Sequence, residues 1–224
     1  MSGLGDSLIN ALALYLAKPD KRYRAATTAD AQPLAAILDR GDVLLSDGNT
    51  RVAALVKRIT RSTWSHVSMY VGPLEEGPDP PCIVEADIAA GVRSIRLSEL
   101  HALQVRVLRR IGLNDKHRHQ LADWVVSQIG GEYDLGHAWT LGRNLLRLPS
   151  SRRLQSPPST MVENATRFIC CSLMAHAFAL VGYPISPVET GIAPTGTVDY
   201  RNLTPADFER ASVFEVVRPI NDAL

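Results

Sequence analysis

The 224-residue sequence has little of what several common protein classes require. It contains three cysteines, two of them adjacent, which does not make the disulfide framework of small secreted domains. Its formal net charge of +1 lacks the basic excess that non-specific binding to nucleic acid needs. No apolar run approaches the about 18 residues expected of a transmembrane helix. What remains, with 46% hydrophobic and 21% charged residues, is typical of a globular chain that can bury a full core.

Several motifs that carry cofactor or metal chemistry are also missing from the chain. There is no Cys-x-x-Cys or His-Glu-x-x-His spacing, so we expect no zinc site and no other metal. There is no Gly-x-Gly-x-x-Gly or phosphate loop, which excludes the common nucleotide-binding folds. The sequence therefore predicts a protein without a cofactor.

The N-terminal region differs in composition from the rest of the chain. Residues 3–17 carry apolar side chains at helical spacing and predict an amphipathic helix, followed by a polar linker over 18–33. We expect this helix to pack on the domain surface, because its polar face lacks the Lys and Arg of a membrane-bound helix. No basic segment precedes the apolar residues and Asp6 interrupts them, so we expect synthesis in the cytoplasm without a signal peptide. We divide the chain into this extension, residues 1–37, and one domain, residues 38–224.

Strands dominate the first half of the domain and helices the second. Alternation of apolar and polar residues predicts strands over 42–46, 64–72, 82–86, 91–96, 104–109 and 213–217. Helical spacing predicts helices over 49–60, 115–129, 132–146 and 170–181, with loops over 147–160 and 186–200. This order indicates an α+β fold in which a small antiparallel sheet packs against helices.

Two cysteines occupy the first turn of the helix predicted over 170–181. Unpaired N–H groups and the positive end of the helix dipole stabilise an anion there, which favours the thiolate form. Projection at about 100° per residue puts Cys170 near the middle of the apolar face and Cys171 at its edge, so Cys171 is the candidate for reactivity. The alternative is that both are inert core residues, as buried cysteines usually are.

A reactive cysteine needs a base, and the base needs a group that orients it. His66 begins a strand that follows a loop, and it is the best candidate for the base. Glu85 lies inside an apolar strand, where a carboxylate is costly unless it is paired, and a histidine across the hairpin would pair it. Asp87, two residues further along the same strand face, is the alternative candidate for the orienting group. His117 and His119 point apart on a predicted helix and make a poor metal pair.

Five motifs in order resemble those of the circularly permuted NlpC-type papain-like hydrolases, the YiiX-like group. They are Gly41-Asp-Val-Leu-Leu, Ser65-His-Val-Ser-Met-Tyr-Val-Gly, Val84-Glu-Ala with Gly91-Val, Gly131-Glu-Tyr-Asp and Phe168-Ile-Cys-Cys-Ser. The likeness runs from about residue 38 to residue 217. It implies a papain-like fold.

The resemblance also assigns roles to residues of the chain. It implies that Cys171 is the nucleophile, because Ser172 follows it, with His66 as the base and Glu85 as the orienting carboxylate. Leu173 departs from the glutamate that relatives often carry at this place, which affects the expected substrate pocket more than the chemistry.

The same resemblance suggests what the protein acts on. It assigns Tyr133, Ser65 and Ser172 to substrate binding and implies a cysteine amidase or endopeptidase that cleaves peptidoglycan stem peptides. Without a signal peptide, such an enzyme would be an antibacterial effector exported to a periplasm by a dedicated secretion system, with an immunity or delivery protein as partner. Two alternatives stay open: hydrolysis or transfer of lipid acyl groups by the same Cys–His pair, and a binding module that has lost catalysis.

Overall fold

A six-stranded antiparallel sheet forms the centre of the protein, with the strand order β4-β3-β2-β1-β5-β8. The computed structural model describes residues 14–20, 23, 31–134, 167–185 and 200–217. The strands of this sheet are β1 (Val43–Asp47), β2 (His66–Tyr70), β3 (Pro81–Asp87), β4 (Gly91–Arg96), β5 (Gln104–Arg110) and β8 (Phe214–Val217). Two further strands, β6 (Glu132–Tyr133) and β7 (Arg167–Phe168), form a separate parallel pair. The predicted α+β class is confirmed.

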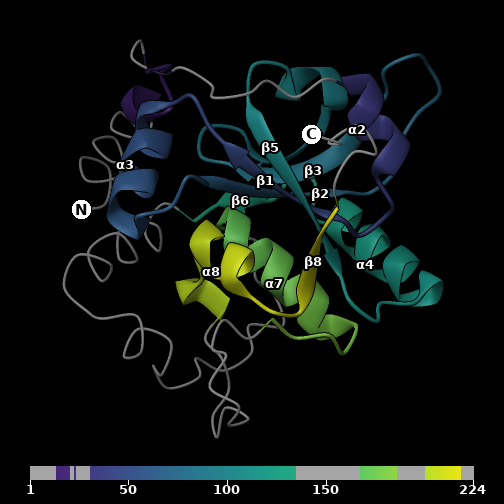
Figure 1. Ribbon diagram of the computed structural model, residues 1–224. Coiled ribbons are helices and arrows are strands. Elements are labelled where there is room, and N and C mark those ends of the chain that lie inside the picture. The colour runs from purple at the N-terminus through teal and green to yellow at the C-terminus, as the bar shows by residue number, and fades with distance from the viewer. Residues whose placement is uncertain (1–13, 21–22, 24–30, 135–166, 186–199, 218–224) are drawn as a thin grey trace, which may run out of the picture.

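Helices cover both faces of the sheet (Figure 1). On one face lie α4 (Asp115–Ser127), α7 (Cys170–Leu180) and α8 (Pro205–Arg210); on the other lie α2 (Ala31–Ile37) and the 3₁₀ helix η1 (Leu97–Leu100). The helix α3 (Arg51–Thr60) connects β1 to β2. Alternation in β2 sends Val67 and Met69 into the core beneath α7, as the sequence predicts, while Leu44 and Ile83 enter the core beneath α2.

The structure differs from the sequence predictions in two segments. The predicted linker contains the start of α2, which the sequence did not indicate because the helix is short and holds Pro33. Leu34 and Leu38 are buried against the sheet, so this stretch is packed rather than free. The helix predicted from residue 132 is wrong at its start, where Glu132 and Tyr133 form β6. Most of the predicted N-terminal helix and the predicted loops 147–160 and 186–199 lie outside the described residues.

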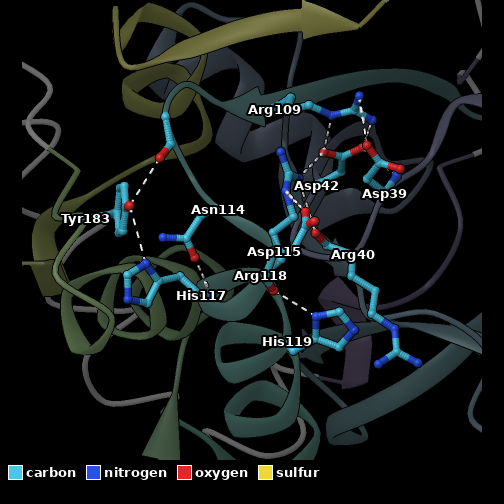
Figure 2. A network of polar contacts seen from close by, with 11 residues as sticks. Asp39, Arg40, Asp42, Arg109, Asn114, Asp115, His117, Arg118, His119 and Tyr183 are labelled. Carbon is cyan, nitrogen blue, oxygen red and sulfur yellow. Dashed lines mark hydrogen bonds and ion pairs between the residues drawn. The ribbon is translucent and has the colours of Figure 1, made fainter.

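One end of β1 is held by a buried charge network. Asp42 is fully buried, and its carboxylate accepts hydrogen bonds from Arg109 Nε at 2.9 Å, Arg109 Nη2 at 2.6 Å and the Asp39 N–H at 2.9 Å. Figure 2 shows Arg109 and Asp42 turned toward each other, with Arg118 on the other side of the carboxylate. The backbone of Asp42 pairs with Tyr70, the last residue of β2. This network therefore anchors the sheet at the end away from His66.

The opposite end of the sheet collects the predicted site residues. His66 begins β2 and pairs with Ser46 near the end of β1, and Glu85 lies opposite Ser68 near the end of β3. The helix α7 begins here at Cys170 and packs against β2 and β3. Within the described ranges, no helix has the length and apolarity needed to cross a membrane.

Candidate active site

His66 and Glu85 meet across the β2–β3 pair. The imidazole Nε2 lies 2.9 Å from Glu85 Oε2. Burial acts to lower the pKa of His66, but the charge of Glu85 and hydrogen bonds with Cys170 and Glu85 outweigh it and raise this pKa well above 6.5. The contact predicted for these two residues is present, and it favours the charged imidazolium.

A second cation holds the other oxygen of Glu85. Arg93, directly opposite Glu85 on β4, donates to Oε1 from Nε at 3.0 Å and contacts it with Nη2 at 2.8 Å. Burial would raise the pKa of Glu85, but the charges and hydrogen bonds of His66 and Arg93 lower it to about 2. Asp87, the rival orienting group, instead accepts from the backbone N–H groups of Ala89 and Ala90 in the following turn.

Cys170 is the cysteine that faces this pair. It is the first residue of α7, where the helix dipole and free N–H groups favour an anion. A hydrogen bond from Cys171 lowers the pKa of the Cys170 thiol, and although burial opposes this, the hydrogen bond and charge of His66 and the backbone N–H of Val67 bring it well below 9.0. Because Nε2 of His66 contacts Glu85, Nδ1 is the nitrogen that is available to the Cys170 thiol.

Cys171 takes a different position from the one the helix projection gave it. Its sulfur lies 3.8 Å from that of Cys170, and its exposed fraction is 2% against 9% for Cys170. The hydrogen bond of His66 to a thiol is with Cys170. The projection at 100° per residue assumes helical geometry on both sides of a residue. Cys170 directly follows Ile169, which is extended, so this assumption does not hold at the first residue of the helix.

Tyr133 lies beside both thiols. Pairing of β6 with β7 sets Tyr133 against Phe168, two residues before the helix begins. Burial and the negative charges of Cys170 and Cys171 raise the pKa of Tyr133 well above 10.0. The phenol therefore keeps its proton and can donate a hydrogen bond beside these two sulfur atoms.

The two serines assigned to substrate binding have their hydroxyl groups engaged with backbone. Ser65 Oγ accepts from the Gly48 N–H at 2.8 Å and donates to the Ser46 carbonyl at 3.3 Å. Ser172 Oγ accepts from the Ile169 N–H at 3.1 Å and lies 3.0 Å from its carbonyl oxygen, so it closes the first turn of α7. These contacts give both serines a structural role; their part in substrate binding stays a prediction.

Comparison with known proteins bears on this geometry. Residues 37–144, which include His66, Glu85, Arg93 and Tyr133, match the model of a family described as a permuted papain-like amidase enzyme, YaeF/YiiX, C92 family. This range, just under half of the chain, identifies a permuted papain-like cysteine hydrolase. Among the curated proteins, none matches it.

The fold of the hydrolase also resembles a solved structure. The crystal structure of the metalloprotein yiiX from Escherichia coli O157:H7 superposes with a TM-score of 0.53 at 15% identity, covering 82% of this chain and 98% of that one. This likeness concerns the fold. In the described part of the hydrolase, no group of three or more His, Cys, Asp or Glu side chains is placed to hold a metal ion.

Two polar residues that support the site of the hydrolase, directly or through its flanking segment, are not predicted from the sequence. Arg93 could have been found from the cross-strand register, since it stands opposite Glu85 once β3 and β4 are paired. Glu209 of α8 accepts a hydrogen bond from Trp64 Nε1 at 2.8 Å and forms an ion pair with Arg106 at 2.7 Å. Trp64 is almost fully buried two residues before His66, so this contact fixes the segment that enters β2. No local pattern indicates a pair that is so far apart in sequence.

Proposed function

We propose that this hydrolase cleaves amide bonds with Cys170 as the nucleophile, His66 as general base and acid, and Glu85 as the carboxylate that orients His66. The observation that carries the proposal is the chain of contacts from the Cys170 thiol through His66 to Glu85. The lowered pKa of Cys170 and the raised pKa of His66 together favour a thiolate–imidazolium pair before substrate arrives.

The reaction follows from these positions. The thiolate attacks the carbonyl carbon, and the negative charge that moves to oxygen is stabilised by backbone N–H groups at the start of α7. His66 gives its proton to the leaving amine as the carbon–nitrogen bond breaks, which leaves a thioester on Cys170. Neutral His66 then takes a proton from water, whose oxygen attacks the thioester, releasing the acid product and restoring the thiolate–imidazolium pair.

Cys170 and Cys171 compete for the nucleophile's role in this proposal. The family resemblance favours Cys171, because it is followed by Ser172. The hydrogen bond with His66 and the greater exposure favour Cys170. We choose Cys170, because the base that activates a thiol forms a hydrogen bond with it. Cys171, whose sulfur is 3.8 Å away, then serves as a hydrogen-bond donor to the thiolate.

We further propose peptidoglycan stem peptides as the substrate. The family is described as an amidase family. The resemblance of the chain's motifs to those of NlpC-type hydrolases supports a peptide bond in the cell wall. In this proposal the enzyme acts as an effector in a periplasm, with a dedicated export system and an immunity or delivery protein as partners. Lipid acyl groups and a purely binding role are the competing hypotheses, and the test separates them.

Mass spectrometry of purified peptidoglycan digested by the wild-type protein and by single cysteine variants tests both proposals. We expect new stem-peptide fragments with the wild type, none with Cys170→Ala, and reduced but measurable cleavage with Cys171→Ala. Cys82→Ala is the matched control, because Cys82 is buried in the opposite core and should leave cleavage intact.

The other outcomes have defined meanings. Loss of cleavage in Cys171→Ala but not in Cys170→Ala would make Cys171 the nucleophile. Release of fatty acids from phospholipid vesicles, with peptidoglycan untouched, would replace the substrate. Binding of peptidoglycan without any product from either source would favour a binding module.

A further inference from the structure

Arg93 contacts one of the two carboxylate oxygens of Glu85, and His66 contacts the other. Both of its contacting nitrogens go to Oε1, which leaves Oε2 for His66. Two donors on one oxygen restrict rotation of the carboxylate about its last side-chain bond, so Oε2 stays directed at the imidazole. The backbones are held in register as well, because Glu85 and Arg93 are directly paired across β3 and β4.

The environment of Glu85 changes during the proposed reaction. Its exposed fraction is 7%, and a buried carboxylate without a partner cation tends to take up a proton. His66 is charged before the attack, but it is neutral once it has given its proton to the leaving amine. At that stage Arg93 is the cation that still contacts Glu85 among the residues described.

Other titratable groups lie near the row formed by Cys170, His66, Glu85 and Arg93. On the side of the thiol, α7 presents Cys170 and Cys171, and β6 presents Tyr133, which keeps its proton. On the side of Arg93, Asp87 and Glu99 are near enough to raise the pKa of the guanidinium together with Glu85. Arg93 therefore stays charged over the whole working range of pH, and the groups from Cys170 to Arg93 alternate in sign.

We propose that Arg93 is a positioning residue that keeps Glu85 ionised and directed at His66 after the imidazole has lost its proton. This inference rests on the proposed function, because it requires His66 to change its charge during the reaction. In this proposal Arg93 acts through Glu85, the residue that it contacts.

The pH dependence of iodoacetamide alkylation at Cys170, located by mass spectrometry, tests this role in the full-length protein. Removing a positive charge raises the pKa of each neighbouring group, so we expect the acid limb of the alkylation profile to move to higher pH in Arg93→Gln. A shift of about one pH unit would reduce the alkylation rate about fivefold at the wild-type midpoint. Arg93→Lys keeps a cation and should shift the limb in the same direction by less.

Arg96→Gln is the matched control for this experiment. Arg96 lies on the same strand, is about half exposed and pairs only loosely, at 3.9 Å, with Glu75, so its loss should leave the profile unchanged. If Arg93→Gln does not fold, the comparison of Arg93→Lys with the wild type decides.

Two results would overturn the proposal. A lowered unfolding temperature with an unchanged alkylation profile in Arg93→Gln and Arg93→Lys would show that Arg93 only secures the strand pair. A wild-type Cys170 that reacts with the pH dependence of an ordinary thiol, near about 8.5, would remove the thiolate itself. The second result is visible without any Arg93 variant, so it identifies failure of the proposed function.

Discussion

The carbonyl oxygen of Gly131 lies so close to Gly91 that a Cβ at this residue would clash with it. The same oxygen accepts a hydrogen bond from the Val92 N–H at 2.8 Å, and the Gly130 N–H donates to the Val92 carbonyl at 2.9 Å. The start of β4 is thereby joined to the residues that lead into β6 and Tyr133. Gly91, which begins β4 directly after a turn, thus sets the distance between the sheet and the segment that carries Tyr133.

Gly91→Ala tests this contact, and Gly112→Ala is its control. Both glycines have a positive φ, 75° and 76°, so both variants carry similar backbone strain of about 1 kcal/mol. Gly112 has open space at its Cβ position, whereas Gly91 does not. We expect urea unfolding to show a loss in Gly91→Ala that exceeds the Gly112→Ala loss by about 1–2 kcal/mol, together with slower alkylation of Cys170. Equal losses in the two variants would contradict the role of this contact.

Glu85 should make the free energy of unfolding depend on pH in the acid range. The folded protein keeps this carboxylate ionised down to about pH 2, whereas the unfolded chain takes up a proton near 4.5. Its contribution is therefore complete above pH 4.5 and is lost as the pH falls from 4.5 to about 2. The difference corresponds to about 3 kcal/mol.

Urea unfolding of the wild type and of Glu85→Gln at several pH values measures this contribution. We expect Glu85→Gln to be less stable at pH 7, with the gap between the two proteins narrowing below about pH 4. Parallel curves for the two proteins between about pH 2 and pH 5 would show that Glu85 is not the titrating group.

Ser172→Ala distinguishes a structural role of this serine from its predicted role in substrate binding. Loss of the hydroxyl removes the closure of the first turn of α7, which should lower the free energy of unfolding by about 1 kcal/mol. Ser127→Ala is the control, because the Ser127 hydroxyl contacts a carbonyl in the last turn of α4 and is exposed. Unchanged stability together with a raised KM for peptidoglycan fragments would instead support substrate binding.

The sequence predicted the contact between His66 and Glu85 because its constraints are local. Alternation in β2 fixes the direction of His66, and a glutamate among apolar residues in β3 requires a partner. A hairpin between these strands brings the two together at 2.9 Å. Most strands of the sheet were predictable for the same reason.

Other parts of the site depend on contacts between distant segments. The sequence around Tyr133 predicts a helix. Tyr133 instead lies in a strand because it pairs with Phe168, and no local pattern indicates this pairing. The choice between Cys170 and Cys171 depends on the hydrogen bond of His66 to Cys170, which joins segments far apart in the sequence. Arg93 became recognisable only when the register of β3 and β4 was known.

The order of the site residues along the chain has a consequence for synthesis. His66 and Glu85 are translated in the first half of the chain, and Cys170 follows after about three quarters of it. A product released early by the ribosome thus contains the imidazole and the carboxylate but no sulfur beside them. In the proposed mechanism such a fragment cannot form a thioester, so incomplete translation gives the producing cell no partly active hydrolase.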